Sequence, residues 1–151
     1  MEKTQGIDNN LLNGVDWMPI LRKYKLTKCL GKGAFGTVVG GVCLTTGQKV
    51  AIKLISDIQT EQVTSYYARK ILREILILRK LSEFDDNIFT NKLIDVILPE
   101  NVTWKKDVEI DGVIEEKQYS DTSKLTHLFL ILERSDRDLK KLIDENPKLD
   151  E

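Results

Sequence analysis

The 151-residue chain has few of the residues that cross-link small domains or bind metal ions. It contains two cysteines, one histidine and three prolines. Cys29 and Cys43 lie in separate apolar segments, and two such residues make no disulfide framework. We therefore interpret them as free thiols in a reducing compartment. We expect a cytoplasmic or nuclear protein with no metal site of its own.

Long apolar runs and a charge excess are also missing. No apolar run approaches the roughly 18 residues that a membrane-spanning helix needs, and the polar start at Met1–Thr4 does not resemble a secretory signal. The chain has 23 Lys and Arg residues against 24 Asp and Glu. This balance creates no long-range field for nucleic acid or anionic lipid, so we expect neither as a partner.

The hydrophobic pattern predicts an α+β fold. Residues 1–22 are polar and aperiodic, and we interpret them as a mobile tail whose end is pinned by Trp17, Ile20 and Leu21. Five segments have strand character: 24–30, 37–44, 49–55, 93–98 and 125–132. The last is apolar on both faces and should be an interior strand. A helix is predicted over 61–81 because its apolar stripe has helical spacing, in Tyr67, Ile71, Glu74, Leu78 and Leu81.

A glycine-rich loop, Gly31-Lys32-Gly33-Ala34-Phe35-Gly36, joins the first two strands. Two phosphate-binding arrangements share this spacing, and in the Rossmann type the loop opens a helix and an acidic residue follows about 20 positions later. Asp57 matches that distance. Val38–Gly41, however, favours a strand, and a strand–turn–strand unit forms a flap whose backbone N–H groups cover phosphates. The alternative is an ordinary glycine-rich hairpin.

Lys53 and Glu74 interrupt apolar surfaces that would otherwise be continuous. Strand alternation places Lys53 on one face with Ala51 and Ile55, where it is either an edge residue reaching water or a cation in a cleft. Glu74 lies in the middle of the helix stripe, where an unpaired carboxylate is costly. It either escapes at the rim or meets a cation. We predict an ion pair between Lys53 and Glu74 that holds the ammonium ready for phosphate oxygens.

These features resemble a known family. Gly31–Val38 and Val50–Lys53 are similar to the first two signatures of eukaryotic Ser/Thr protein kinases, and Leu72–Ile75 supplies the glutamate of that family's αC helix. The amino-acid sequences of Leu72–Ile75 and of Asp138–Leu142 look most like those of the mitogen-activated protein kinases. The resemblance implies a kinase N-lobe, with a five-stranded antiparallel sheet, one packed αC helix and the start of a second lobe.

The resemblance also implies a site for ATP. Lys53 and Glu74 would be the catalytic residues, with Lys53 on the α- and β-phosphates, and Val38 and Ala51 would pack above adenine. Leu132 takes the gatekeeper position, and residues 133–135 would form the hinge. The implied nucleotide-binding residues are Leu30, Gly31, Lys32, Gly33, Ala34, Phe35, Gly36, Val38, Ala51, Lys53, Leu132, Glu133, Ser135 and Asp138.

Two kinase motifs are missing from the sequence, the His-Arg-Asp catalytic loop and the Asp-Phe-Gly magnesium loop. Asp138 imitates the first, but Asp136 and Ile143 stand where His and Asn are needed. Its position directly after the last strand fits the hinge and the following helix instead, and the resemblance implies that Asp138 lies near the ribose. Mg²⁺ is expected with ATP, although its protein ligands are absent. We assign residues 23–135 to the N-lobe and hinge, and 136–151 to the first helix of a truncated second lobe.

The segment 99–124 is an insertion between the last two strands. Its Asp111-Gly112 pair is a strong signal for a two-residue turn, which predicts antiparallel pairing of Val108–Ile110 with Val113–Glu115. The alternative is a disordered loop.

Two functions of different class fit the sequence. The first is the ATP-binding lobe of a Ser/Thr protein kinase, truncated before its catalytic loops, with ATP and a protein substrate or regulatory protein as partners. The parent reaction transfers the γ-phosphoryl group of Mg·ATP to a protein hydroxyl. The second is a stand-alone, non-catalytic module that binds nucleotide or a partner protein.

Overall fold

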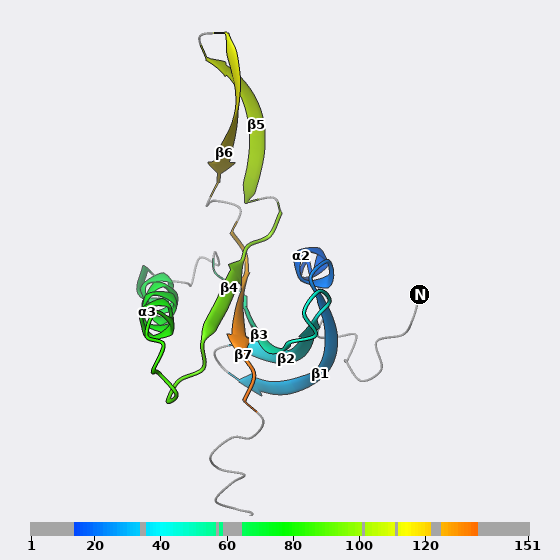
Figure 1. The fold of residues 1–151 in the computed structure, drawn as a ribbon, viewed down its shortest axis with the longest axis vertical. Coiled ribbons are helices and arrows are strands. Elements are labelled where there is room, and N and C mark those ends of the chain that lie inside the picture. The colour runs from blue at the N-terminus through cyan, green and yellow to red at the C-terminus, as the bar shows by residue number, and fades with distance from the viewer. Residues whose placement is uncertain are drawn as a thin grey trace, which may run out of the picture.

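The chain forms a five-stranded antiparallel sheet with one long helix beside it, as predicted (Figure 1). The computed structural model describes residues 14–33, 36–56, 58, 65–100, 102–110, 112–121 and 125–135. In chain order the elements are α2 (Met18–Leu21), β1 (Tyr24–Gly33), β2 (Gly36–Cys43), β3 (Lys49–Ile55), α3 (Ser65–Ser82), β4 (Leu93–Ile97), β5 (Thr103–Ile110), β6 (Val113–Ser120) and β7 (Leu128–Glu133).

The strand order β1-β2-β3-β7-β4 places β7 inside the sheet, between β3 and β4. Both faces of an interior strand are covered, which explains its apolar sequence. Residues Leu128 to Ile131 are indeed at most 4% exposed. The prediction of a covered interior strand is confirmed.

One face of the sheet, here called the outer face, is packed against the segment before β1. Its buried cluster consists of Trp17, Ile20, Tyr24, Leu26, Val39, Val50, Ile52, Leu54, Ile97, Phe129 and Ile131. The ring centroids of Trp17 and Phe129 lie 4.9 Å apart. Trp17 and Ile20 are therefore anchors of the domain, as predicted, whereas Leu21 is 41% exposed and pins nothing. Of the predicted tail, residues 1–13 lie outside the described residues.

The other face, here called the inner face, packs against α3. Its buried members are Ile55, Ile71, Leu128 and Leu130. The side chains of the predicted helix stripe are all buried or half-buried. The predicted helix start at residue 61 lies outside the described residues. At the other end, the Ser82 hydroxyl donates to the Leu78 carbonyl at 2.7 Å and accepts from the Leu93 N–H at 2.8 Å, which fixes the end of α3 to the start of β4.

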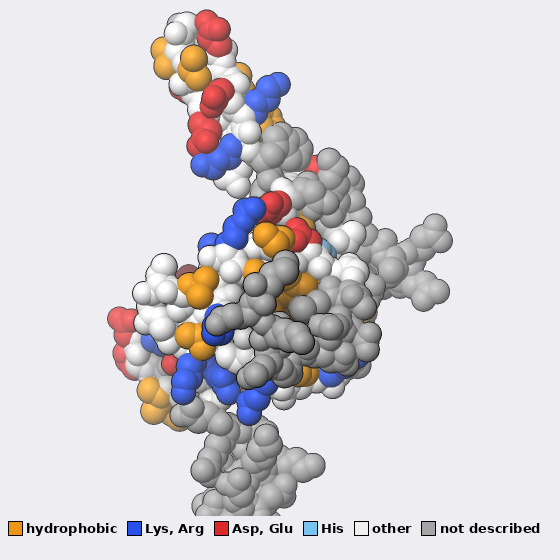
Figure 2. All heavy atoms as spheres, turned by 90° about the vertical axis from the view of Figure 1, so that its right-hand side faces the viewer, with side chains coloured by type: hydrophobic (Ala, Val, Ile, Leu, Met, Phe, Trp, Pro, Cys, Tyr) orange, Lys and Arg blue, Asp and Glu red, His pale blue; other side chains and the backbone are white. Residues whose placement is uncertain are grey.

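Strands β5 and β6 form a separate hairpin that extends away from the five-stranded sheet (Figure 1). Val108 pairs with Glu115 and Ile110 with Val113, and Gly112 has φ +79°, the left-handed conformation that the turn needs. The predicted pairing is confirmed, although Asp111 itself lies outside the described residues. Figure 2 shows charged side chains along this hairpin and hydrophobic ones near its tip.

Candidate functional site

The ion pair predicted between β3 and α3 is present. Lys53 Nζ lies 2.6 Å from Glu74 Oε1, with the two side chains 17% and 37% exposed. Glu74 comes from the middle of α3, so it reaches the sheet only because the helix packs its apolar stripe on the inner face. The partial exposure keeps the electrostatic contribution to stability small. The consequence of the pair is geometric, because it holds the Lys53 ammonium above the inner face.

The surface around Lys53 is apolar. Residues that pair directly across antiparallel strands share a face, and Lys53 pairs with Val38 on β2. Ala51, two residues before it on β3, pairs with Leu132 on β7. Val38, Ala51 and Leu132 are all partly exposed. They lie on the same face as Lys53, so an apolar surface borders the Lys53 cation.

The glycine-rich segment continues this surface as a hairpin. Gly31 pairs with Val38 and Gly33 with Gly36, and a strand follows Gly36 where a Rossmann loop would open a helix. The backbone at Gly36 requires glycine, because φ is +117° and an added Cβ would lie 2.1 Å from the Leu54 carbonyl oxygen. A Cβ at Gly31 or Gly33 would meet no atom of the described residues within 4 Å. Their backbone is therefore open to a ligand on that side.

Other predicted residues of the loop are less defined. Lys32 is exposed and Leu30 is 38% exposed, whereas Ala34 and Phe35 lie outside the described residues. The structure thus places the two ends of the glycine-rich loop next to each other, in strands that adjoin Lys53. It does not describe the tip of the loop.

The segment after β7, where the hinge is predicted, is tied to the start of β4. The Glu133 N–H donates to the Lys92 carbonyl at 2.8 Å, and the Ser135 hydroxyl donates to Asn91 Oδ1 at 2.7 Å. These bonds hold the exit of β7 beside the apolar surface formed by Val38, Ala51 and Leu132. Asp138 and the predicted helix after it lie outside the described residues.

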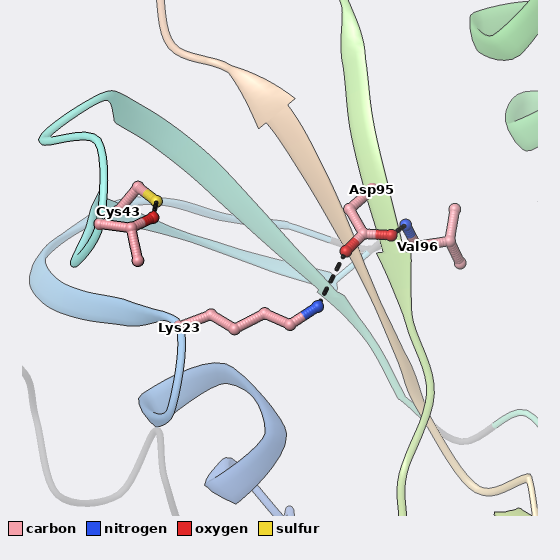
Figure 3. A network of polar contacts seen from close by, with 5 residues as sticks. Lys23, Cys43, Asp95 and Val96 are labelled. Carbon is pink, nitrogen blue, oxygen red and sulfur yellow. Dashed lines mark hydrogen bonds and ion pairs between the residues drawn. The ribbon is translucent and has the colours of Figure 1, made fainter.

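A second group of polar contacts lies at the far ends of β1 and β2 (Figure 3). Lys23 Nζ lies 3.3 Å from Asp95 Oδ2, and Asp95 Oδ1 accepts from the Val96 N–H at 2.8 Å. Cys43 Sγ lies 3.2 Å from Thr45 Oγ1. Hydrogen bonds from Thr45 and Thr46 lower the pKa of the Cys43 thiol to about 6. The sequence interpretation missed this effect, although the Thr45-Thr46 pair directly after Cys43 was a readable signal.

Both cysteines are free thiols, as predicted. Within the described ranges, no cluster of three or more His, Cys, Asp or Glu side chains is arranged to hold a metal ion. No helix in the described part of the chain has the length and apolar character to cross a membrane.

Sequence comparison agrees with the fold. No family model matches the chain. It is 44% identical over 63 residues to mitogen-activated protein kinase 10 of Oryza sativa subsp. japonica, a match that covers 42% of this chain and 10% of the relative. It is 34% identical over 88 residues to mitogen-activated protein kinase 19 of Arabidopsis thaliana, covering 58% of this chain and 14% of the relative. In sequence and in fold, the chain is similar to a protein kinase N-lobe.

The similarity is to the mitogen-activated protein kinases, and each of these two matches spans no more than a seventh of the relative's length. Mitogen-activated protein kinase 15 of Oryza sativa subsp. japonica is a further relative, 46% identical over 63 residues. The five-stranded antiparallel sheet and packed helix are those expected of the family's N-lobe.

Proposed function

We propose that this N-lobe binds ATP on its inner face, as the nucleotide-binding lobe of a Ser/Thr protein kinase. The parent reaction would transfer the γ-phosphoryl group of Mg·ATP to a protein hydroxyl. The observation that carries the proposal is the 2.6 Å Lys53–Glu74 pair. It holds a cation between an apolar surface and a glycine hairpin, which is the combination that a purine with a phosphate tail requires.

Each part of the site has a distinct task in this proposal. The adenine packs on Val38, Ala51 and Leu132, and backbone groups of residues 133–135 hydrogen-bond its edge. The phosphates lie under the glycine hairpin, whose backbone N–H groups approach them because Gly31 and Gly33 carry no side chain. Lys53 binds the α- and β-phosphate oxygens, and Glu74 orients Lys53. Asp138 is assigned to the ribose.

The 151 residues contain neither His-Arg-Asp nor Asp-Phe-Gly. We therefore expect this chain by itself to bind ATP weakly and to transfer no phosphate, because nothing in it orients a substrate hydroxyl or holds magnesium. A protein substrate or regulatory protein, and a place in the cytoplasm or nucleus, belong to the proposal for a full-length kinase. The second candidate is a stand-alone, non-catalytic module that binds nucleotide, for which the same Lys53–Glu74 pair and glycine hairpin would serve.

The test is titration with a fluorescent ATP analogue, combined with a radiolabelled γ-phosphate transfer assay on a generic protein substrate. Lys53→Ala should weaken binding about tenfold or more, because a charge-assisted hydrogen bond to phosphate is lost. Lys25→Ala, the same change at an exposed lysine on β1, is the matched control and should bind like the wild type. Equal binding by both variants would contradict the proposal. Transfer that disappears in Lys53→Ala would mean that the chain is a complete enzyme.

A further inference from the structure

The Arg134 side chain extends from the end of β7 back over the β1–β2 pair. A Cβ built on Gly40 of β2 would lie 3.2 Å from Arg134 Nη1 and 2.5 Å from Thr27 Oγ1 of β1. Gly40 pairs with Ala51, so the guanidinium lies on the inner face, beside the apolar surface assigned to adenine. Its approach depends on glycine, because any side chain at position 40 would occupy the space between Arg134 and Thr27.

The Thr27 hydroxyl is a buried oxygen that has no hydrogen-bond partner among the described residues. It is placed there by a bulge in β1, where the register shifts between Leu26 and Cys29 and two residues oppose Gly40. Bulges commonly redirect side chains beside functional sites. A buried hydroxyl without a partner is costly, and the neighbouring guanidinium carries five N–H donors. A small movement of residue 134 toward β1 would bring donor and acceptor together.

The hinge and the glycine hairpin are the two parts of the site that a nucleotide would bridge. On its other side, the hinge is held by the hydrogen bonds from Glu133 and Ser135 to residues 91 and 92, which directly precede β4. A ligand whose base contacts the hinge and whose phosphates contact the hairpin would draw these two parts together. A ligand without phosphates would contact the hinge side alone.

We propose that Arg134 is a positioning residue, which donates a hydrogen bond to Thr27 Oγ1 when a nucleotide bridges the hinge and the glycine hairpin. This inference rests on the proposed ATP site. The bond latches the hinge onto β1 and so sets the spacing between the base-binding and phosphate-binding parts. Because the latch forms in the bound state, its free energy adds to the affinity of ligands that reach both parts.

The test compares the affinities of ATP and adenosine for the full chain, measured by titration calorimetry. Thr27→Val keeps the shape of the side chain and removes the hydroxyl, and Arg134→Met removes the donor. We expect each variant to lose about three- to tenfold in ATP affinity, the range of one intramolecular hydrogen bond. Adenosine affinity should stay unchanged. The double variant should lose no more than either single variant, because both remove the same bond.

Further variants separate the latch from charge and from stability. Gly40→Ala leaves every charge in place but occupies the space between donor and acceptor, so it should show the same loss for ATP. Arg79→Met, at an exposed arginine of α3, makes the same charge change away from the latch and should have no effect. Thr27→Val should also keep the melting temperature of the wild type, because the free chain makes no hydrogen bond there.

The outcomes distinguish this inference from the proposed function. A wild-type chain that binds neither ATP nor adenosine overturns both. A wild-type chain that binds ATP, with Thr27→Val binding equally well, overturns the latch alone. Losses in Thr27→Val and Arg134→Met that add up in the double variant, or equal losses for ATP and adenosine, would also contradict it.

Discussion

The two faces of the five-stranded sheet are built from alternate residues of the same strands, yet they differ in burial and in charge. On β3, the outer-face residues Val50, Ile52 and Leu54 are at most 5% exposed. The inner-face residues Ala51 and Lys53 are half-buried, and Lys53 meets Glu74 there. One strand thus contributes to the hydrophobic core on one face and to the candidate site on the other.

The difference shows how a small domain can carry an open, charged surface without unfolding. A fully buried Ile or Leu side chain contributes about 1.5–3 kcal/mol, and the outer cluster contains several such residues beneath Trp17 and Ile20. On the inner face, the described buried residues gather on the side of α3, where Ile71 belongs to the same cluster as Leu128 and Leu130. The larger buried cluster therefore lies on the outer face, and the candidate site lies on the inner one.

Neighbouring residues on β7 give the largest expected contrast between the faces. Ile131 is fully buried on the outer face, whereas Leu132 is partly exposed on the inner face. Ile131→Ala should lower the free energy of unfolding by about 2–5 kcal/mol. Leu132→Ala should lower it by clearly less, because its side chain is already partly hydrated. Urea unfolding measures both values.

The two variants should rank in the opposite order when ATP affinity is measured instead of stability. Leu132→Ala should weaken ATP binding, since Leu132 lies on the surface assigned to adenine, whereas folded Ile131→Ala protein should bind like the wild type. Equal unfolding free energies for the two variants would show that the faces do not divide stability and binding.

Removing the β5–β6 hairpin should have a much smaller effect on stability. Among the described strands, β5 and β6 pair with each other and form a sheet separate from the five-stranded one. Replacing residues 103–120 with a short Gly-Ser loop should change the free energy of unfolding by about 1 kcal/mol or less, because loop-closure entropy changes slowly with length. Val102, which is 1% exposed, is retained. A loss as large as that of Ile131→Ala would mean that the hairpin belongs to the core.

The smallest expected effect on stability concerns Cys43, whose polar thiol lies at the rim of the outer face. Cys43 packs at the edge of the outer cluster, and hydrogen bonds from Thr45 and Thr46 lower the pKa of its thiol to about 6. In a Cys29→Ser background, the rate of alkylation by iodoacetamide should rise as the pH passes through about 6, where the thiolate forms.

Thr45→Val is the variant that checks the cause of this shift. Without the Thr45 hydrogen bond, the pKa should return toward its ordinary value, so the rise in alkylation rate should move to higher pH. An unchanged profile would show that the Thr45 hydroxyl does not stabilise the thiolate. Cys29→Ser and Thr45→Val both leave the buried side chains of the sheet unchanged, so the free energy of unfolding should remain nearly constant.

Local sequence signals predicted most of the fold and part of the candidate site. The sequence predicts the ion pair between Lys53 and Glu74 because each residue places a charge on an otherwise apolar, periodic face, where an unpaired charge is costly. The hairpin at Asp111-Gly112 was predicted because two residues with positive φ leave few choices of sequence. The prediction that Leu21 anchors the N-terminal segment was wrong, because the short helix α2 turns Leu21 outward and buries Ile20.

The sequence by itself determined the strands, the helix stripe, the glycine hairpin and the two residues of the ion pair, since all of these follow from local periodicity and spacing. Only the tertiary structure decided that the Arg134 guanidinium and the Thr27 hydroxyl would lie near each other beside Gly40. That proximity depends on the strand order, on the bulge in β1 and on the path of the chain after β7. The direction of such a long side chain has no local signature, because residues far apart in the sequence set it together.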